Sequence, residues 1–414
     1  MYRFPLNDIR VLDLTMAWAG PYATRLLADM GAEVIKIEAV NSWDMIRTFT
    51  GLAPATDRIW DKSPYFNGLN RNKYGCALDL AQPRGRDLFL RLVGVSDVVI
   101  ENFRAEVMAN LDLTYDVLSA VNDQIIAVSM PALGLSGPER DFIAYGTHAE
   151  QLAGLTHLTG YPDGPPHKTG ISYGDPLAGI SAAGAVALAL WDRRRTGRGQ
   201  HIEVAQRENL INVIGEYIVA FSLTGNEPAR RGNRHSSMAP HGCYPCAGDD
   251  QWITIACETD AQFAALCDAV GQPALAGDDR FADVVSRYRN EAALDEVIAA
   301  WTGTRSKADA ATALQSAGVP AAPVQAIPDV FQDEQLRARD FFQPQMHRVA
   351  GEWEIEATHW RMSETPGHVR LPAPAFAEHN CYVFGELLGL SGDEIAALEA
   401  NGITGNAPNW AVHE

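Results

Sequence analysis

Short apolar segments alternate with helical segments along the first half of the chain, and this alternation constrains the fold more than any other feature. Apolar and β-branched residues at 11–14 and 32–37 enclose an amphipathic segment at 22–30, the pattern of one strand–helix–strand unit. The pattern recurs, with expected strands at 76–80, 97–100, 125–129 and 201–205 and expected helices at 83–92 and 176–191. Such repetition predicts an α/β fold, a Rossmann-like, doubly wound parallel sheet.

A different texture begins near residue 232 and predicts a second domain. A loop rich in Gly, Pro and His precedes an expected strand at 252–256 and helical patterns at 261–270, 290–302 and 307–317. A chain of 414 residues, 47% hydrophobic, is long enough to bury two cores. We expect residues 1–225 to form the first part of a large α/β domain and residues 226–330 a smaller α+β domain. Residues 331–414 would return to the large domain and end in a helix at 392–400.

Composition excludes several classes of function. The net charge of -19 repels polyanions, so nucleic acid is a poor candidate partner, although a few local cations can still hold a small anionic ligand. The N-terminal residues do not resemble a signal peptide, and the longest apolar run, at 180–191, is short and rich in Gly and Ala. Six widely spread cysteines do not form a disulfide framework. We therefore expect a cytoplasmic protein without a membrane partner.

Asp175 is the most informative single position. It follows a turn and directly precedes Pro176, a residue that favours the first position of a helix. The ordinary interpretation is a helix N-cap, in which the carboxylate accepts the free N–H groups of the first turn. Capping is compatible with catalysis, because a helix N-terminus keeps a carboxylate ionised and oriented, as a nucleophile requires.

Two other motifs in the sequence allow alternative chemistry. Residues 170–174 match G-x-S-x-G, the nucleophile elbow of serine hydrolases, with Ser172 as the nucleophile. That motif needs a strand directly before it, whereas residues 162–169 are rich in turn formers. Cys243 and Cys246 form a C-x-x-C without a second matching pair, so we expect small apolar side chains beside a hairpin and no metal site.

The segment after the expected strand at 97–100 is a candidate ligand site. Ligands of open α/β sheets bind outside the carboxyl ends of the strands, which places Arg104 where it could meet a phosphate. Arg71 and Lys73 could extend the same basic rim, although exposed cations near a sheet edge are commonly structural. Residues 130–169 are rich in Gly, Pro and Thr, and we expect long loops around a cavity there.

Taken together, the segments resemble the class III CoA-transferases, the family that includes formyl-CoA transferase and carnitine CoA-transferase. The resemblance covers nearly the whole chain. It rests on six segments in the same order, at 11–39, 69–80, 98–104, 158–179, 194–205 and 378–391.

The resemblance implies that Asp175 attacks an acyl-CoA thioester and passes through an acyl-aspartyl anhydride and an aspartyl-CoA thioester before a carboxylic acid acceptor collects the coenzyme A. Coenzyme A would be a substrate, with no tightly bound cofactor. The implied substrate neighbourhood comprises Trp18, Tyr145 and Gly174, and the implied coenzyme A site comprises Ala19, Lys73, Asn102, Phe103 and Arg104. The family forms dimers of two interlocked chains, so a homodimer is expected, with a second, different subunit as the alternative.

Two comparisons within the superfamily refine the expected reaction. Related racemases place a histidine thirty residues before the aspartate, and here that position is Tyr145, a poor base at neutral pH. His148 lies nearby, which leaves an α-methylacyl-CoA racemase as the alternative. Formyl-CoA transferase has glutamine at the position of Trp18 and a glycine-rich loop in its smaller domain, which residues 232–246 lack. These departures favour a larger, less polar acyl group. The segment 158–176 most resembles transferases that use succinyl donors and aryl or branched acceptors, so succinyl-CoA is a candidate donor.

Overall fold

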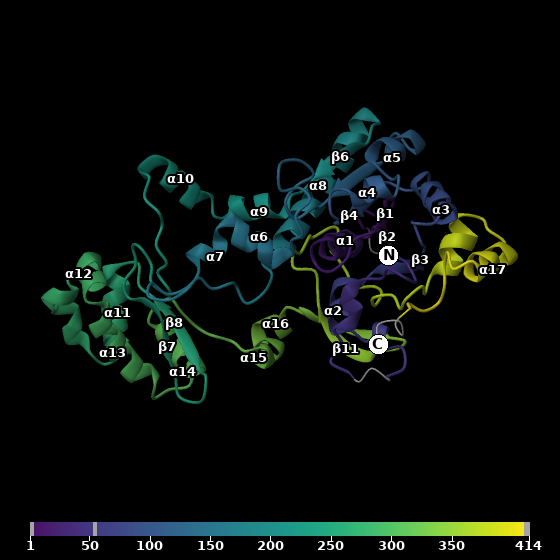
Figure 1. Ribbon diagram of the computed structural model, residues 1–414. Helices are drawn as coiled ribbons and strands as arrows, with labels where there is room; N and C mark the ends of the chain where they lie inside the picture. Colours follow the sequence, from purple (N-terminus) through teal and green to yellow (C-terminus); the bar gives the residue numbers. More distant parts are fainter. Residues whose placement is uncertain (1–3, 53–55, 410–414) are drawn as a thin grey trace. The chain divides into compact units, whose positions relative to one another are not determined.

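A computed structural model describes residues 4–52 and 56–409, and its chain divides into two compact units. The larger unit comprises residues up to 156 together with 168–226 and 337 onward. The smaller unit comprises residues 157–167 and 227–336. The chain therefore leaves the larger unit twice, briefly at 157–167 and for a longer stretch at 227–336, and returns to it each time (Figure 1).

A six-stranded parallel sheet forms the centre of the larger unit, as the alternation predicted. Its order is β3-β2-β1-β4-β5-β6, so the order reverses between β1 and β4. The strands are β1 (Arg10–Asp13), β2 (Glu33–Glu38), β3 (Lys73–Ala77), β4 (Val98–Glu101), β5 (Ile126–Ser129) and β6 (Gln200–Glu203). In a sheet of this kind ligands bind at the carboxyl ends of the strands, beside the point where the order reverses.

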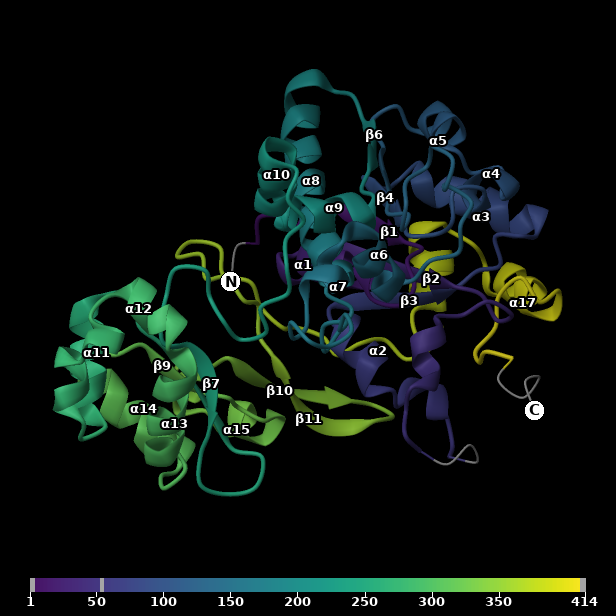
Figure 2. The same cartoon turned by 60° about the vertical axis from the view of Figure 1, so that its left-hand side comes forward.

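Helices cover both faces of this sheet. On one face α1 (Ala19–Asp29) and α8 (Gly174–Thr196) pack on β1, β4 and β5, and on the other α3 (Pro83–Val93), α5 (Tyr115–Val121) and α17 (Gly392–Ala400) enclose a second apolar core. Figures 1 and 2 show α17 beside α3, although they lie at opposite ends of the sequence. Gly179 lets α8 approach α1 closely, since a Cβ there would lie 2.7 Å from the Ala19 carbonyl oxygen. Gly179, with the buried Ala178 and Ala182 beside it, therefore serves helix packing.

By length and composition alone, α8 would be able to cross a membrane. Its Ala178, Ala182, Val186 and Leu190 belong to the core between the helices and the sheet. The helix thus has a structural role within the larger unit, which length and composition do not reveal.

Several shorter elements also belong, wholly or in part, to the larger unit. They are α2 (Pro64–Leu69), α4 (Val107–Asn110), α6 (Gly146–Ala153), α7 (Leu155–Leu158), α9 (Gln206–Val213) and α10 (Gly215–Thr224), and the antiparallel pair β10 (Phe342–His347) and β11 (Gly351–Glu356). The expectation of loops throughout 130–169 was wrong for α6 and α7. Gly146 begins α6 and Gly154 ends it in the left-handed conformation, so glycine here marks helix ends.

The smaller unit contains a three-stranded antiparallel sheet in the order β7-β8-β9 with helices packed against it. Its elements are β7 (His241–Pro245), β8 (Trp252–Ala256), β9 (Ala321–Pro323), α11 (Asp260–Ala269), α12 (Val284–Arg289), α13 (Glu291–Thr302) and α14 (Lys307–Ser316), followed by α15 (Ile327–Gln332) and by α16 (Glu334–Ala338), which runs into the larger unit. Cys243 lies on the β7–β8 hairpin and Cys246 directly follows β7, as expected, and both are free thiols.

Candidate active site

Asp175 lies in the first turn of α8, one residue inside the helix. The N-cap residue is Tyr173, so the expected capping role of Asp175 was wrong. The helix begins at Gly174, before the proline, so Asp175 is a residue of its first turn. The carboxylate instead accepts hydrogen bonds from the Ser172 side chain and from the backbone N–H of Ala19. Because Ala19 is the first residue of α1, the N-terminal ends of two helices meet at one carboxylate.

The environment of Asp175 makes its carboxylate unusually basic. Burial, with a smaller contribution from the negative charge of Glu150, raises its pKa from 3.8 to about 6. The hydrogen bonds from Ser172 and Ala19 lower it, but they do not offset the burial. At neutral pH the group is therefore mostly ionised, and it is a stronger nucleophile and base than an exposed aspartate.

Helix α6 supplies two further constraints on Asp175. Its buried Glu150 accepts hydrogen bonds from the Thr169 hydroxyl, 3.2 Å from each carboxylate oxygen, and from the Tyr173 backbone N–H, which fixes the turn before α8. Gly146, the first residue of α6, lies against the aspartate, since a Cβ built there would be 2.0 Å from Asp175 Oδ2. No sequence pattern pointed to either residue, because both lie in the segment expected to be a loop.

Asp175 opens into a pocket of about 470 Å³ within the larger unit. Its lining brings together most of the predicted site residues: Trp18, Asn102, Phe103, Arg104, Tyr145, Ser172 and Asp175. Asn102 links two of the lining segments, since its side-chain oxygen accepts the Met16 N–H at 2.8 Å and its amide donates to the Met16 carbonyl at 2.8 Å. The residues that precede α1 and those that follow β4 therefore form one continuous wall.

Three predicted residues do not line this pocket. Ala19 and Gly174 are buried, and Ala19 takes part only through its backbone N–H. Lys73 is 1% exposed, and its Nζ lies 3.0 Å from Asp13 Oδ2 and 2.8 Å from Asn70 Oδ1. The ammonium is thus committed to a buried ion pair beneath the site. Arg71 is likewise buried and paired with Asp29, so the basic rim expected from these two residues is absent.

Two positive side chains do lie in the pocket lining, Arg104 and Arg140, and both are exposed. The other lining residues are largely apolar and aromatic, among them Phe49, Phe142 and Ile143. Asp175 is the one acidic residue of the lining. The pocket therefore suits a ligand with an apolar body and negative charge at its ends.

Tyr65 on α2 is a pocket residue that sequence reasoning missed. Its ring meets Trp18 edge-on at a centroid distance of 5.7 Å. Burial raises the pKa of its phenol well above the ordinary range, and the charges of Asp175 and Asp44 add to the rise. The phenol consequently stays protonated and can donate a hydrogen bond inside the pocket. Residues 41–72 carry no clear periodic pattern, so no feature of the sequence pointed to it.

The alternative chemistries lack the geometry they need. His148 is exposed, does not line the pocket, and accepts the Tyr145 N–H at its Nδ1 (3.1 Å), so it faces no substrate space. Residues 160–171, all of them described, contain no strand, and Ser172 therefore does not sit on a nucleophile elbow. Among the described residues, no group of three or more His, Cys, Asp or Glu side chains could hold a metal ion.

A parallel α/β sheet with a basic carboxylate beside an anion-compatible pocket fits an enzyme that transfers a group by way of that carboxylate. The family model described as CoA-transferase family III matches residues 6–380, and the chain belongs to this family. It is 36% identical over 396 residues to the succinyl-CoA–D-citramalate CoA-transferase of Chloroflexus aurantiacus, covering 96% of this chain and 97% of the relative.

Two further comparisons agree. The chain is 33% identical over 402 residues to the alpha subunit of succinyl-CoA–L-malate CoA-transferase from Chloroflexus aurantiacus, covering 97% of this chain and 93% of the relative. A solved structure of a CAIB/BAIF family protein from Brucella suis superposes with a TM-score of 0.84 at 33% identity, covering 93% of this chain and 99% of the other. The protein is therefore an enzyme that transfers coenzyme A between an acyl-CoA and a carboxylate.

Proposed function

We propose that Asp175 is the covalent nucleophile of this transfer. The observation that carries the proposal is a single, partly buried carboxylate of raised pKa that opens into the pocket between two helix N-termini. An aspartate that is basic yet ionised at neutral pH can attack a thioester carbonyl. Passing the acyl group through an enzyme carboxylate also keeps the energy of the thioester, which hydrolysis would waste.

The proposed reaction has four steps, each a displacement at a carbonyl carbon. An oxygen of Asp175 attacks the donor thioester, the carbon–sulfur bond breaks, and a mixed anhydride and coenzyme A thiolate form. The thiolate then attacks the aspartyl carbonyl carbon, which releases the donor acid and leaves an aspartyl-CoA thioester. The acceptor carboxylate displaces the thiolate to form a second anhydride. Finally the thiolate attacks the acceptor carbonyl, which yields the new acyl-CoA and restores Asp175.

The surrounding residues would bind and orient the two substrates. We assign the coenzyme A chain to the wall formed by Asn102, Phe103 and Arg104, where Arg104 is exposed and can meet a phosphate. Ala19 is buried and would contribute only the backbone N–H that it donates to Asp175. Trp18 and Tyr145 would contact the acyl group, and Gly174 keeps the start of α8 close to Leu210 because a Cβ there would approach that side chain to 2.8 Å. Lys73 has no place in this assignment, since its ammonium is buried.

We further propose that the carboxylate substrates are short dicarboxylic acids, with succinyl-CoA as the donor. The two relatives described above are named for succinyl-CoA with citramalate or malate, and each of these acids carries a second carboxylate. In the pocket, Arg140 is a cation separate from the Asn102–Arg104 segment and could bind that second carboxylate. The apolar lining would accommodate the carbon chain between them.

An assembly of two chains is the proposed working form, with the interlocked arrangement of the family. Helix α10 has no buried residue, and its Ile218, Val219, Phe221 and Leu223 are between 51% and 80% exposed. An apolar helix of this kind needs a cover. We propose a second copy of this chain, and a different subunit is the alternative outcome. The six free thiols fit the reducing conditions of the cytoplasm, where we place the reaction.

Mass spectrometry of the intact protein after brief incubation with succinyl-CoA tests the nucleophile. The wild-type chain should gain the mass of coenzyme A less water, because a thioester forms at the carboxylate, and Asp175→Ala should gain nothing. Ser172→Ala is the matched control: it removes a neighbour of the carboxylate but should still form the adduct. An adduct that persists in Asp175→Ala, or that disappears only in Ser172→Ala, would reject the assignment.

A further inference from the structure

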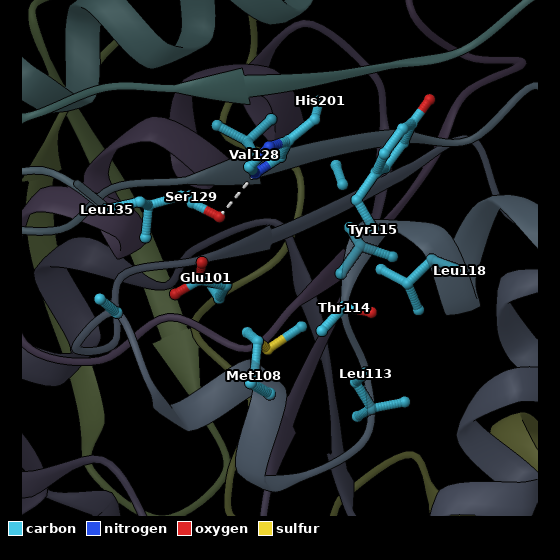
Figure 3. A pocket seen from close by; sticks show the side chains of 14 residues that line it. Glu101, Met108, Leu113, Thr114, Tyr115, Leu118, Val128, Ser129, Leu135 and His201 are labelled. Atoms are coloured by element: carbon cyan, nitrogen blue, oxygen red, sulfur yellow. Dashed lines mark hydrogen bonds between the residues drawn. The ribbon is translucent and has the colours of Figure 1, made fainter.

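A second, smaller cavity of about 140 Å³ lies between the strands β4, β5 and β6 and the helices α4 and α5 (Figure 3). Most of its lining is apolar, including Met108, Leu113 and Leu118. Three polar side chains interrupt this lining, one from each strand: Glu101, Ser129 and His201. None of the three belongs to the lining of the pocket that contains Asp175.

These three side chains form a hydrogen-bonded row across the sheet. Glu101 and Ser129 are paired in register on β4 and β5, and the Ser129 hydroxyl donates to the Glu101 carboxylate. His201 Nε2 lies 3.0 Å from Ser129 Oγ, the contact dashed in Figure 3. The tautomer of His201 decides which of these two groups donates. Tyr115 stacks on the imidazole at a centroid distance of 5.7 Å and fixes its plane.

The row ends on the backbone of the pocket wall. Glu101 is 4% exposed, and its Oε2 accepts the backbone N–H of Phe103 at 2.7 Å. That N–H lies just beyond the end of β4, where no strand partner is available to it. The next link is Asn102, whose side chain binds both backbone groups of Met16. The segment 102–104 is therefore held by two contacts. Glu101 binds the Phe103 backbone, and the Asn102 side chain binds the Met16 backbone.

We propose that Glu101, with Ser129 and His201 behind it, is a positioning residue that holds the segment 102–104 in the shape that binds acyl-CoA. The inference rests on the proposed assignment of coenzyme A to this segment. Glu101 would act through the Phe103 backbone and would not touch the substrate. Its loss should weaken acyl-CoA binding and leave the chemistry at Asp175 largely intact.

The charges around Glu101 make this support depend on pH. On β5 the neighbour of Glu101 is the neutral Ser129, and on β6 the neighbour of Ser129 is His201. Burial lowers the pKa of His201, and the charge of Glu203 acts in the opposite direction. The nearest arginine of the segment, Arg104, is exposed and pairs with Glu106 at 3.2 Å, and on β1 Asp13 is paired with Lys73. Burial therefore dominates and raises the pKa of Glu101 to about 7, against the hydrogen bonds from Ser129 and Phe103. Protonation below this value weakens the bond to Phe103.

Steady-state kinetics on Glu101→Gln and Ser129→Ala test the proposal, with calorimetric titration of free coenzyme A as a second measurement. We expect the KM for acyl-CoA and the Kd for coenzyme A to rise about tenfold, since a hydrogen bond to a charged acceptor is weakened. The kcat and the KM for the acceptor acid should stay within about twofold. Met108→Leu, which changes the same cavity without touching the polar row, is the control and should behave as wild type.

A pH series separates positioning from a general loss of structure. The wild-type KM for acyl-CoA should rise as the pH falls through about 7, and this part of the rise should be missing from Glu101→Gln. The phosphomonoester of coenzyme A also titrates near pH 6, so the difference between the two profiles is the quantity to compare. Amide hydrogen exchange of the peptide spanning 102–106, measured without substrate, should be faster in both variants than in Met108→Leu.

The outcomes distinguish this inference from the proposed function. Unchanged coenzyme A affinity and unchanged exchange in Glu101→Gln and Ser129→Ala would overturn the inference, whatever the mass of the Asp175 adduct. A fall in kcat with constant KM would also overturn it, because Glu101 would then act on the reaction itself. Faster exchange at 102–106 without any effect on coenzyme A would keep the support for the segment but reject its role in binding.

Discussion

At the scale of single residues, the pKa of Asp175 links its surroundings to activity. A nucleophilic carboxylate must be ionised, so kcat/KM should fall tenfold per pH unit below the pKa of about 6 and stay level above it. Because the Ser172 hydrogen bond lowers that pKa, Ser172→Ala should move the midpoint of the profile to higher pH. A pH–rate profile of both proteins between pH 5 and about 8.5 measures the midpoints.

The substrate phosphate titrates in the same range, so only the displacement between the two profiles is diagnostic. Superimposable profiles would show that the ionisation in the profile belongs to another group. A displacement to lower pH in Ser172→Ala would mean that Ser172 accepts a hydrogen bond from Asp175 and does not donate one.

Gly146 is a position where an added side chain would collide directly with the Asp175 carboxylate. In Gly146→Ala the new Cβ would lie 2.0 Å from Asp175 Oδ2, far inside van der Waals contact distance. The carboxylate would therefore have to rotate. Displacing a reacting group by about 1 Å commonly costs about 100-fold in rate, so kcat should fall by about that factor. Kinetics with succinyl-CoA, together with the yield of the aspartyl adduct, provide the measurement.

The same substitution elsewhere in the site helices is the control. Gly184 lies in α8 with no atom within 4 Å of a built Cβ, so Gly184→Ala should keep full activity. Wild-type activity in Gly146→Ala would show that the carboxylate can react from a different rotamer.

At the scale of secondary-structure elements, what the sequence predicted well was local. The β1–α1–β2 unit, the parallel sheet and the helix that carries Asp175 all follow from periodicity and from Pro176, and the structure confirms them. What it could not predict depends on partners distant in the sequence. The segment of α6 has loop composition, yet it is helical because Ala149, Ala153 and Leu210 pack together. Lys73 resembles a surface cation until Asp13, sixty residues earlier, is placed beside it.

The Lys73–Asp13 pair has a structural role within the sheet, where it joins the start of β3 to the end of β1. Although burial raises the pKa of Asp13, Lys73 and Lys36 lower it to about 2, and the carboxylate also accepts the Thr15 and Thr24 hydroxyls. Lys73→Met would leave this charge without its nearest cation and should cost about 3–5 kcal/mol of unfolding free energy. Urea unfolding measures that loss, and titration shows whether the folded fraction still binds coenzyme A with unchanged affinity.

A double variant provides the matched comparison. In Asp13→Asn with Lys73→Met no uncompensated charge remains, so the destabilisation should be smaller than in Lys73→Met alone. Weaker coenzyme A binding at full stability in Lys73→Met would instead return Lys73 to the binding site.

At the scale of the whole molecule, the net charge of -19 opposes the approach of an acyl-CoA, which is itself an anion. Salt screens this repulsion over about 8 Å under physiological conditions. Binding therefore depends on charges close to the ligand, and in the described pocket lining these are Arg104 and Arg140. Local cations thus explain how an acidic protein can bind an anionic substrate. The net charge alone would have argued against binding of any anionic ligand.

The exposed apolar surface of α10 predicts association of chains. A charge on this helix would have to be buried against a partner without compensation, so Ile218→Asp and Phe221→Asp should shift the protein from dimer to monomer. Light scattering coupled to size exclusion gives the mass of each variant. Val121→Asp, a change at a similarly exposed position at the end of α5, should leave the mass unchanged. A wild-type monomer with full activity would contradict the proposed assembly, and an inactive monomer that gains mass and activity only with a different subunit would favour a hetero-oligomer.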